Sequence, residues 1–378
     1  MNFKPFDNST KNFFDDGFIE GFNLLPDSKY TILRQGLLDY YHTYHSFSGN
    51  MYEYIHKYPN NKIESSRARG HDFSMRYFSA VSFVQIFIEL YVKEILEKIN
   101  PILILGTLKN NEEKGFINYI CNEISRFNQP SDGKTVPFSV ALKRLITLIK
   151  SDSKIPENFR VPTKFHLFAE NMEMLNHFAA IRNSINHRGN QVMSRYAFEL
   201  LFSNYIIPFI TALLRLNPRE TLLERDIFCK KNVLDELCKI KLEEDYKDAS
   251  KFEYITKSLA HINHLKELGR ASYNNVLHMG EDYKVDDKEK ERKLAIMNER
   301  ERTFNEEVAK FLQSEFNYYD IHQCPCCGAN SLITYMEFSN NKITSARCLI
   351  CSYKINDEIG EPKEFEIMDK EIFVYSEG

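Results

Sequence analysis

The chain has 378 residues, more than one domain usually contains, and 43% of them are hydrophobic, which is enough for a sizeable core. Only 14 glycines and 12 prolines are present, and this scarcity favours helices over a turn-rich β architecture. The formal net charge of −4 excludes recognition of a polyanion by overall basic charge. The bulk properties therefore predict a mainly α protein with two or three domains.

Charge is nevertheless uneven along the chain. Residues 71–217 carry 17 Lys and Arg against 13 Asp and Glu, so the rest of the chain is acidic. The basic residues are densest between 134 and 164 and include Arg144. This excess is a modest hint of a phosphate-bearing partner, although a solvated surface explains it nearly as well.

No targeting or membrane segment stands out in the sequence. The start, "MNFKPFDNSTKNFFDDG", lacks the uninterrupted apolar stretch of a signal peptide. The runs "FSAVSFVQIFIELYV" and "YIIPFITALLRL" are too short or too polar to span a bilayer. We therefore expect a cytoplasmic protein with no membrane partner, in which the eight cysteines are thiols or metal ligands rather than disulfides.

Residues 1–70 are predicted to form an N-terminal extension that packs on the rest of the chain. They are irregular in pattern and rich in Phe and Tyr, with one helix expected at "KYTILRQGLLDYYHTYHSF". The polar stretch "YPNNKIESSRARG" then breaks the pattern.

Residues 71–217 are predicted to form an antiparallel helical bundle. The strongest signal covers 73–99, where apolar residues recur at helical spacing and give a wide buried stripe. Pro101 follows directly and ends that helix. Further helices are expected at 111–126, 137–151, 165–187 and 193–215, the last of them kinked at Pro208. Short links between four or five helices are typical of a bundle.

The composition and the predicted secondary structure change twice after residue 217. Residues 218–319 are strongly charged and still helical in pattern, which predicts an elongated connector or a partner-binding arm. Residues 320–378 form a small, strand-prone, cysteine-rich module with an acidic tail. The predicted fold class is therefore mainly α, with a small β module at the end.

The cysteine-rich module carries the most specific motif of the chain. Cys324 and Cys327 form one C-x-x-C pair, Cys348 and Cys351 form a second, and 20 residues separate the pairs. Two such knuckles supply the four thiolates that suit tetrahedral Zn²⁺. Between them, "SLITYMEF" and "KITSARC" alternate like two strands of a hairpin. The arrangement resembles a zinc ribbon, and a closed four-cysteine site indicates structural zinc.

Two further groups could replace one of these ligands. Cys326 is a spare thiol inside the first knuckle, and His322 lies two residues before that knuckle. The motif does not identify the binding partner of the ribbon. Its acidic tail disfavours strong phosphate binding and fits protein contact or dimerisation at least as well.

A second candidate site lies in "AAIRNSINHRGN", residues 179–190, near the end of a predicted helix. Asn183 and His187 are four residues apart and share a helix face, toward which the long side chain of Arg182 can reach. RNA cleavage by its own 2′-hydroxyl needs proton transfer and cationic stabilisation of the phosphorane. Histidine titrates near neutrality, and arginine grips phosphate in a bidentate manner. The alternative interpretation is a helix-end cap, in which the macrodipole favours the cations His187 and Arg188.

The stretch "RNSINH" resembles the Arg-polar-x₃-His signature of HEPN domains, many of which are ribonucleases of bacterial toxin–antitoxin and phage-defence systems. The helix "YFSAVSFVQIFIELYVKEIL" resembles the first long helix of that family, and the likeness covers about residues 73–216. It implies a homodimer in which two copies of the motif form one site. It also implies that His187 transfers protons, Arg182 holds the scissile phosphate, and Asn183 orients either group. Glu89 would be the acidic residue that pairs with Arg182, although a common surface pair with Lys93, four residues further on, explains Glu89 about equally well.

Three hypotheses follow from these features. The first is a metal-independent endoribonuclease that leaves 2′,3′-cyclic phosphate and 5′-hydroxyl ends and acts as a toxin or abortive-infection effector. An antitoxin or a phage trigger would then be a partner. The second is a non-catalytic HEPN module that dimerises while the ribbon recruits protein or nucleic acid. The third is a nucleic-acid-binding regulator in which the zinc module binds and the bundle is scaffold.

Overall fold

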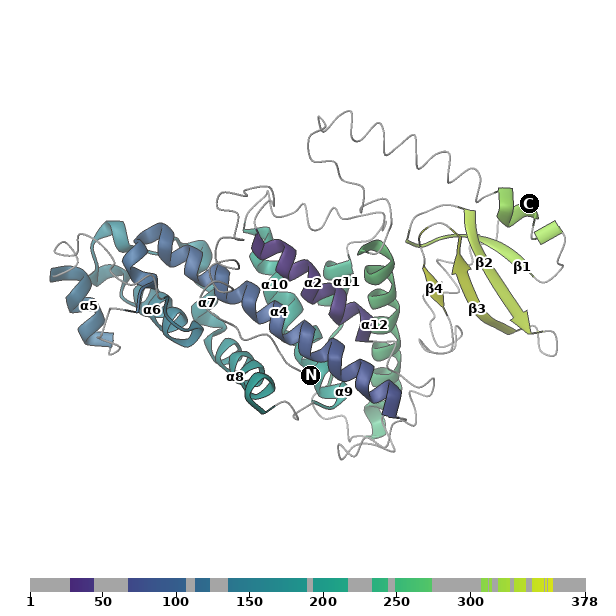
Figure 1. Ribbon diagram of the computed structural model, residues 1–378, viewed down its shortest axis with the longest axis horizontal. Helices are drawn as coiled ribbons and strands as arrows, with labels where there is room; N and C mark the ends of the chain where they lie inside the picture. The colour runs from purple at the N-terminus through teal and green to yellow at the C-terminus, as the bar shows by residue number, and fades with distance from the viewer. Residues whose placement is uncertain are drawn as a thin grey trace, which may run out of the picture.

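The computed structural model is mainly helical and carries a small antiparallel sheet near its C-terminus (Figure 1). It therefore confirms the predicted fold class at this coarse level, whereas the HEPN-like bundle stays a prediction. The residues that it describes are 28–43, 67–106, 113–122, 135–188, 193–216, 233–243, 249–273, 307–311, 313–314, 319–326, 330–337, 342–349, 351 and 353–355.

Two long helices form the centre of the molecule. Helix α4, Arg67–Ile99, begins earlier than its predicted start, and helix α2, Ser28–His42, packs along it (Figure 1). Gly36 allows this close approach, because a Cβ atom at that position would lie only 2.9 Å from Cγ2 of Val84. The predicted N-terminal extension thus contributes a core helix.

The next helices run along one end of α4. They are α5 (Glu113–Asn122), α6 (Phe138–Lys150), α7 (Leu167–Glu170) and α8 (Met172–Arg188). The single helix expected at 165–187 is interrupted between α7 and α8 at Asn171, whose side-chain amide donates to the carbonyl of Leu167 at 2.8 Å. Single turns of 3₁₀ helix fill the connections at Pro101–Ile104, Asp152–Lys154, Glu157–Phe159, Thr163–Phe165 and Ala249–Lys251.

A π-helical turn lies just before Pro208, the residue at which a kink was expected. Helix α9 (Arg195–Leu201) continues through the π turn η7 (Phe202–Ile206) into α10 (Ile207–Arg215). Pro208 has no N–H to donate to the carbonyl four residues earlier, and the wider π register accommodates this missing bond. Asn204 in the π turn uses its side-chain amide to bond both backbone groups of Leu242, at 2.8 and 2.9 Å.

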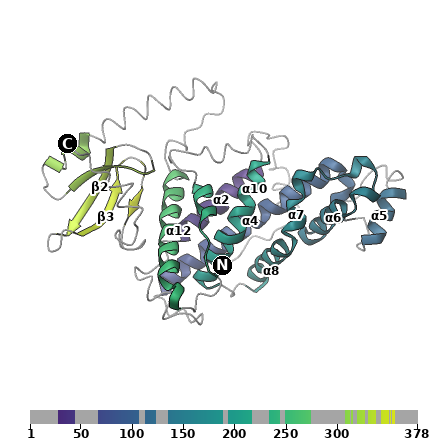
Figure 2. The ribbon, with the colours of Figure 1, turned by 180° about the vertical axis from the view of Figure 1, so that it is seen from behind.

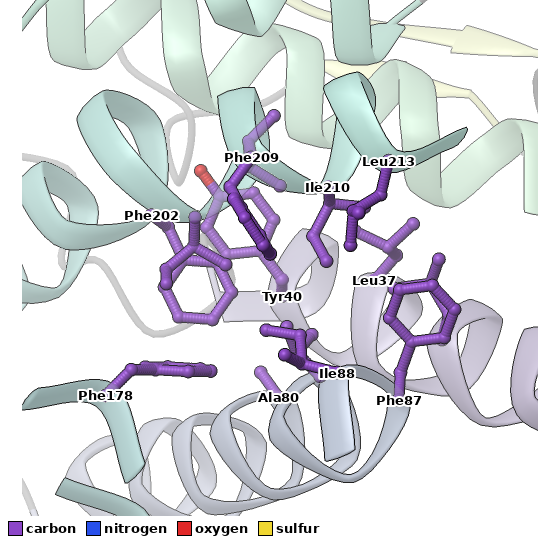
Figure 3. Close-up of a cluster of buried hydrophobic side chains, with 14 of the residues drawn as sticks. Leu37, Tyr40, Ala80, Phe87, Ile88, Phe178, Phe202, Phe209, Ile210 and Leu213 are labelled. Atoms are coloured by element: carbon purple, nitrogen blue, oxygen red, sulfur yellow. The ribbon is translucent and has the colours of Figure 1, made fainter. Parts of the chain in front are cut away.

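Residues Arg195–Arg215 are long and apolar enough to cross a membrane by length and composition alone. Within the protein, 67% of this stretch's apolar window is buried. The aromatic rings around it explain the burial: Phe202 stacks on Tyr40 at 4.7 Å between ring centroids and lies 6.1 Å from Phe178 (Figure 3). The stretch is therefore a core helix of the bundle.

Helix α12, Phe252–Tyr273, packs against α2, and α11, Val233–Lys239, contacts both α10 and α12. Gly269 of α12 faces the ring of Tyr41, where a Cβ atom would lie 2.6 Å from Cε2. The charged composition of residues 218–319 predicted an elongated connector, but α12 is buried almost continuously from Ser258 to Ser272. Composition misled because the charges of Lys266, Glu267 and Arg270 are buried in ion pairs, whereas the pair of Glu253 and Lys257 near the start of the helix is exposed.

The C-terminal module is a four-stranded antiparallel sheet in the order β1-β2-β3-β4. Its strands are β1 (Tyr319–Gln323), β2 (Asn330–Glu337), β3 (Lys342–Cys348) and β4 (Lys354–Ile355). The expected hairpin is confirmed as β2 and β3, whereas β1 and β4 were not predicted. Both views place α12 between the bundle and this sheet (Figures 1 and 2).

Candidate functional site

Three cysteines of the C-terminal module meet in its interior. Cys324 follows β1, Cys348 ends β3, and Cys351 lies in the turn before β4. All three are buried, and their Sγ atoms lie within 4.8 Å of one another. Cys327, the fourth predicted ligand, lies outside the described residues. The sequence spacing therefore located a real cluster of thiols.

The donor geometry of this cluster fits a metal ion. Zinc–sulfur bonds of about 2.3 Å in a tetrahedron place neighbouring sulfurs about 3.8 Å apart. Sγ of Cys324 and Sγ of Cys351 are 3.5 Å apart, which is close to that value and far beyond a disulfide bond. The backbone N–H of Cys351 donates to Sγ of Cys348 at 3.5 Å, and the hydroxyl of Ser331 lies 3.2 Å from the same sulfur. The three thiols are thus compatible with a metal site.

The two alternative ligands lie elsewhere. The Sγ atom of Cys326 faces helix α12, 4.0 Å from the carbonyl oxygen of Leu268. Neither Cys326 nor His322 belongs to the three-cysteine group formed within the described part of the chain. Cys326 therefore contacts the bundle instead of joining that group.

The second candidate site is at the C-terminal end of α8. Arg182 is half-buried, and its Nη1 donates to Oδ1 of the exposed Asn183 at 3.2 Å. Its Nε is buried and has no hydrogen-bond partner in the described part of the chain. A buried donor without a partner costs free energy, which a suitable acceptor would recover.

His187 is placed only by its backbone, one helical turn beyond Asn183 on α8. Its side chain lies outside the described residues, as does Gly189, which was expected to cap the helix. The structure thus brings Arg182 and Asn183 together, and a contact between Arg182 and His187 stays a prediction.

Within the described residues of this single chain, Glu89 does not pair with Arg182. The carboxylate of Glu89 pairs with Lys93 at 2.7 Å, and Lys93 also donates to the hydroxyl of Thr135 at 3.2 Å. The reason is helix register. Phe168 of α7 packs against Tyr91, 6.2 Å between ring centroids, which sets the level of Glu89 along the bundle.

Arg182 lies 14 residues beyond Phe168, or roughly 20 Å along the helix direction. The other end of α8 belongs to a different level of α4, because Phe178 shares an aromatic cluster with Phe202, Phe198 and Tyr77. Glu89 and Arg182 therefore occupy opposite ends of the α4–α8 contact.

Arg144, counted in the basic stretch, is a structural residue. Its Nη1 donates to the carbonyls of Leu103 and Leu105 at 2.8 and 2.9 Å, and the side chain is buried. Burial lowers the pKa of its guanidinium. Arg144 therefore does not contribute to a phosphate-binding surface in the basic stretch.

A buried ion pair that the sequence did not indicate joins α12 to the bundle. Lys266 and Glu199 of α9 are fully buried and form a salt bridge. Lys266 also donates to the hydroxyl of Thr43 at 2.6 Å, and the hydroxyl of Tyr40 donates to Glu199 at 3.2 Å. Burial lowers the pKa of Lys266 to about 8 against the opposing effect of Glu199. Burial, with Glu199 nearby, raises the pKa of Tyr40.

The other face of α12 contacts the sheet module. The ring Nε2 of His264 and the hydroxyl of Tyr353 are 2.8 Å apart. Glu267 accepts two bonds of 2.6 Å from Arg270, and its Oε1 also accepts the backbone N–H of Lys354 at 2.8 Å. No local motif marks these residues, because their partners are about 90 residues away in the sequence.

Comparison with known proteins adds no relative: no family model matches the chain, and neither does any curated protein or solved structure.

Proposed function

We propose that the protein is a metal-independent endoribonuclease whose site is centred on Arg182 and His187. It would cleave RNA by attack of the 2′-hydroxyl and leave 2′,3′-cyclic phosphate and 5′-hydroxyl ends. It would act in the cytoplasm as a toxin or abortive-infection effector. The resemblance of "RNSINH" to the HEPN signature supports this reaction class.

The observation that carries the proposal is the hydrogen bonding of Arg182. Its Nη1 is held by Asn183, while Nε on the opposite side has no partner in the described chain. Nε and Nη2 form one edge of the guanidinium, the edge that binds two phosphate oxygens in parallel. Asn183 thus holds one nitrogen of the arginine, while the buried Nε donor of the other edge lacks an acceptor among the described residues.

The remaining roles follow from the chemistry. His187 would take the proton from the 2′-hydroxyl or give one to the leaving 5′-oxygen, because histidine is the side-chain type best suited to proton transfer at neutral pH. Arg182 would stabilise the charge of the phosphorane. A second copy of the chain would supply the complementary Arg182 and His187, so we propose a homodimer with one composite site.

We also propose that the cysteine cluster holds structural Zn²⁺, with Cys327 as the fourth ligand to Cys324, Cys348 and Cys351. Four thiolates favour zinc over the harder cations that prefer oxygen ligands. When bound, the ion would supply folding free energy to the module and take no part in RNA cleavage.

The test is cleavage of total RNA by wild type, Arg182→Ala and His187→Ala in buffer freed of divalent cations, with the RNA ends mapped. Zinc content is measured in each sample, so that a loss of zinc is separated from a loss of chemistry. His177→Ala is the matched control, since His177 is an exposed histidine on the same helix.

Cleavage by wild type and His177→Ala with cyclic phosphate ends, and none by the other two, is the expected result. Equal cleavage by all four proteins would sink the assignment. A companion test is growth: toxicity on expression is expected to disappear with His187→Ala and to persist with His177→Ala.

A second candidate function is a non-catalytic module that dimerises and recruits protein or nucleic acid. The pairing of Glu89 with Lys93 favours it, because the acidic partner implied for Arg182 is engaged elsewhere. This alternative predicts RNA binding or protein capture without cleavage and without toxicity that depends on His187.

A further inference from the structure

We propose that the metal centre of the sheet module controls the stability of α12 in the bundle, so that loss of the metal loosens a core helix as well as the module itself. This inference does not depend on the ribonuclease proposal. It follows from the way in which α12 is held on two opposite faces.

The bundle-facing side of α12 carries Lys266 and Gly269, which are three residues apart and share a helix face. Lys266 pairs with Glu199 and bonds Thr43, whereas Gly269 lies against the ring of Tyr41. All these contacts tie α12 to α2 and α9.

The opposite side of α12 carries His264, Glu267 and Leu268, which lie between 100° and 200° around the helix from Lys266 at about 100° per residue. Each of them contacts the sheet module: His264 contacts Tyr353, Glu267 accepts the N–H of Lys354, and the carbonyl of Leu268 lies near Cys326. The helix is therefore clamped between bundle and module (Figures 1 and 2).

The contacting residues of the module belong to the segments that carry the metal-binding thiols. Cys326 is two residues after Cys324, while Tyr353 and Lys354 are two and three residues after Cys351. Within these short turns the N–H of Cys348 donates to the carbonyl of Tyr353 at 2.7 Å, which links the second thiol pair directly to the residue that contacts His264. The metal is thus expected to set the conformation of the surface on which α12 rests.

The contact between α12 and the sheet module is small, but it involves a buried ion pair. Glu267 is fully buried and Arg270 nearly so, and Glu267 joins this pair to the module by accepting the N–H of Lys354. When the module loosens, this pair gains access to water and the carboxylate loses the N–H of Lys354. The free-energy difference between the docked and undocked states of α12 then shrinks, and the effect reaches α2 through Lys266 and Thr43.

The experiment is hydrogen exchange on the full chain, measured as purified, after removal of metal with a chelator, and after addition of Zn²⁺ back. Chelation is expected to speed exchange about tenfold in residues 252–273 and 28–43 as well as in 319–355, and Zn²⁺ is expected to reverse it. Faster exchange confined to 319–355 would overturn the proposal. A chain that carries no metal and binds none would overturn it too.

Two tyrosine variants separate the contact from the metal. Tyr353→Phe removes the hydroxyl that bonds His264, and it is expected to bind one Zn²⁺ per chain yet to exchange several-fold faster in 252–273. Tyr254→Phe is the matched control, because it removes a hydroxyl on α12 that bonds the carbonyl of Lys241, away from the module. Equal exchange of 252–273 in the two variants would contradict the proposed route.

Discussion

The end of α8 and the middle of α12 are both rich in polar and charged side chains, but the fold uses them in opposite ways. On α12, Lys266, Glu267 and Arg270 are buried, and each has an oppositely charged partner. On α8, Asn183 is exposed and Arg182 is half-buried, and the guanidinium keeps a buried donor that has no acceptor among the described residues. Buried and paired charges join parts of the fold, whereas a half-buried charge whose donor lacks an acceptor among the described residues is a candidate for binding a ligand.

The largest expected effect is on RNA cleavage and comes from substitutions at the end of α8. Arg182→Ala and His187→Ala are each expected to lower the rate of RNA cleavage by about 10²–10⁴-fold, because proton transfer or charge stabilisation is lost. Thermal unfolding is expected to change little for Arg182→Ala, since the hydrogen bond of Arg182 within the described residues goes to an exposed asparagine. Cleavage rates and melting curves of the same samples check this. A large fall in melting temperature with unchanged cleavage would assign Arg182 to the architecture.

The next effect tests the α12 side. Lys266→Met leaves Glu199 buried without its partner and is expected to lower the free energy of unfolding by about 3–5 kcal/mol. The double variant Glu199→Met with Lys266→Met is expected to recover most of this loss, because it removes both charges. Urea unfolding of the three proteins measures both steps. A single variant as stable as wild type would show that the pair is dispensable.

Changing the pH is expected to alter the free energy of unfolding through the same pair, Lys266 and Glu199, by a smaller amount. The folded chain lowers the pKa of Lys266 to about 8 from an ordinary value of 10.5, so between these values the unfolded chain holds a proton that the folded chain has lost. Raising the pH from 8 to 9.5 therefore favours folding at this residue, and below pH 8 its contribution is constant. The unfolding free energy of wild type minus that of the double variant is expected to rise over this range. A fall over the same range would reverse the inferred sign.

The smallest expected effect concerns Glu89. Glu89→Gln removes a half-buried ion pair with Lys93 and is expected to change the unfolding free energy by less than about 1 kcal/mol. Cleavage is expected to change less than about threefold, since the register of α4 and α8 separates Glu89 from Arg182. A hundredfold loss of cleavage would instead restore Glu89 to the site through the partner chain.

Local patterns predicted the features that depend on neighbours in the sequence. Helical periodicity located α4 and α6, and strand alternation located the β2–β3 hairpin. The spacing of Cys324, Cys348 and Cys351 predicted the thiol cluster, because each knuckle is a single turn whose geometry the sequence determines.

The features that the sequence did not predict depend on tertiary contacts. Pairing of Glu89 with Arg182 required a helix register that no local pattern encodes, and the chain placed Phe168 at the level of Tyr91 instead. The burial of α12 was hidden by its charged composition, since Glu199 lies 67 residues from Lys266. Charge counts measure the residues of a segment and do not measure their partners.

The position of α2 also determines how the protein can be shortened. A chain beginning at residue 67 would retain both proposed sites in full. It would lose Gly36, which packs against Val84, and the ring of Tyr41, which packs against Gly269. It would also remove Thr43 from Lys266 and expose apolar faces of both α4 and α12 to water. Shortened forms intended for biochemistry should therefore start upstream of Ser28, and one that starts later is expected to aggregate.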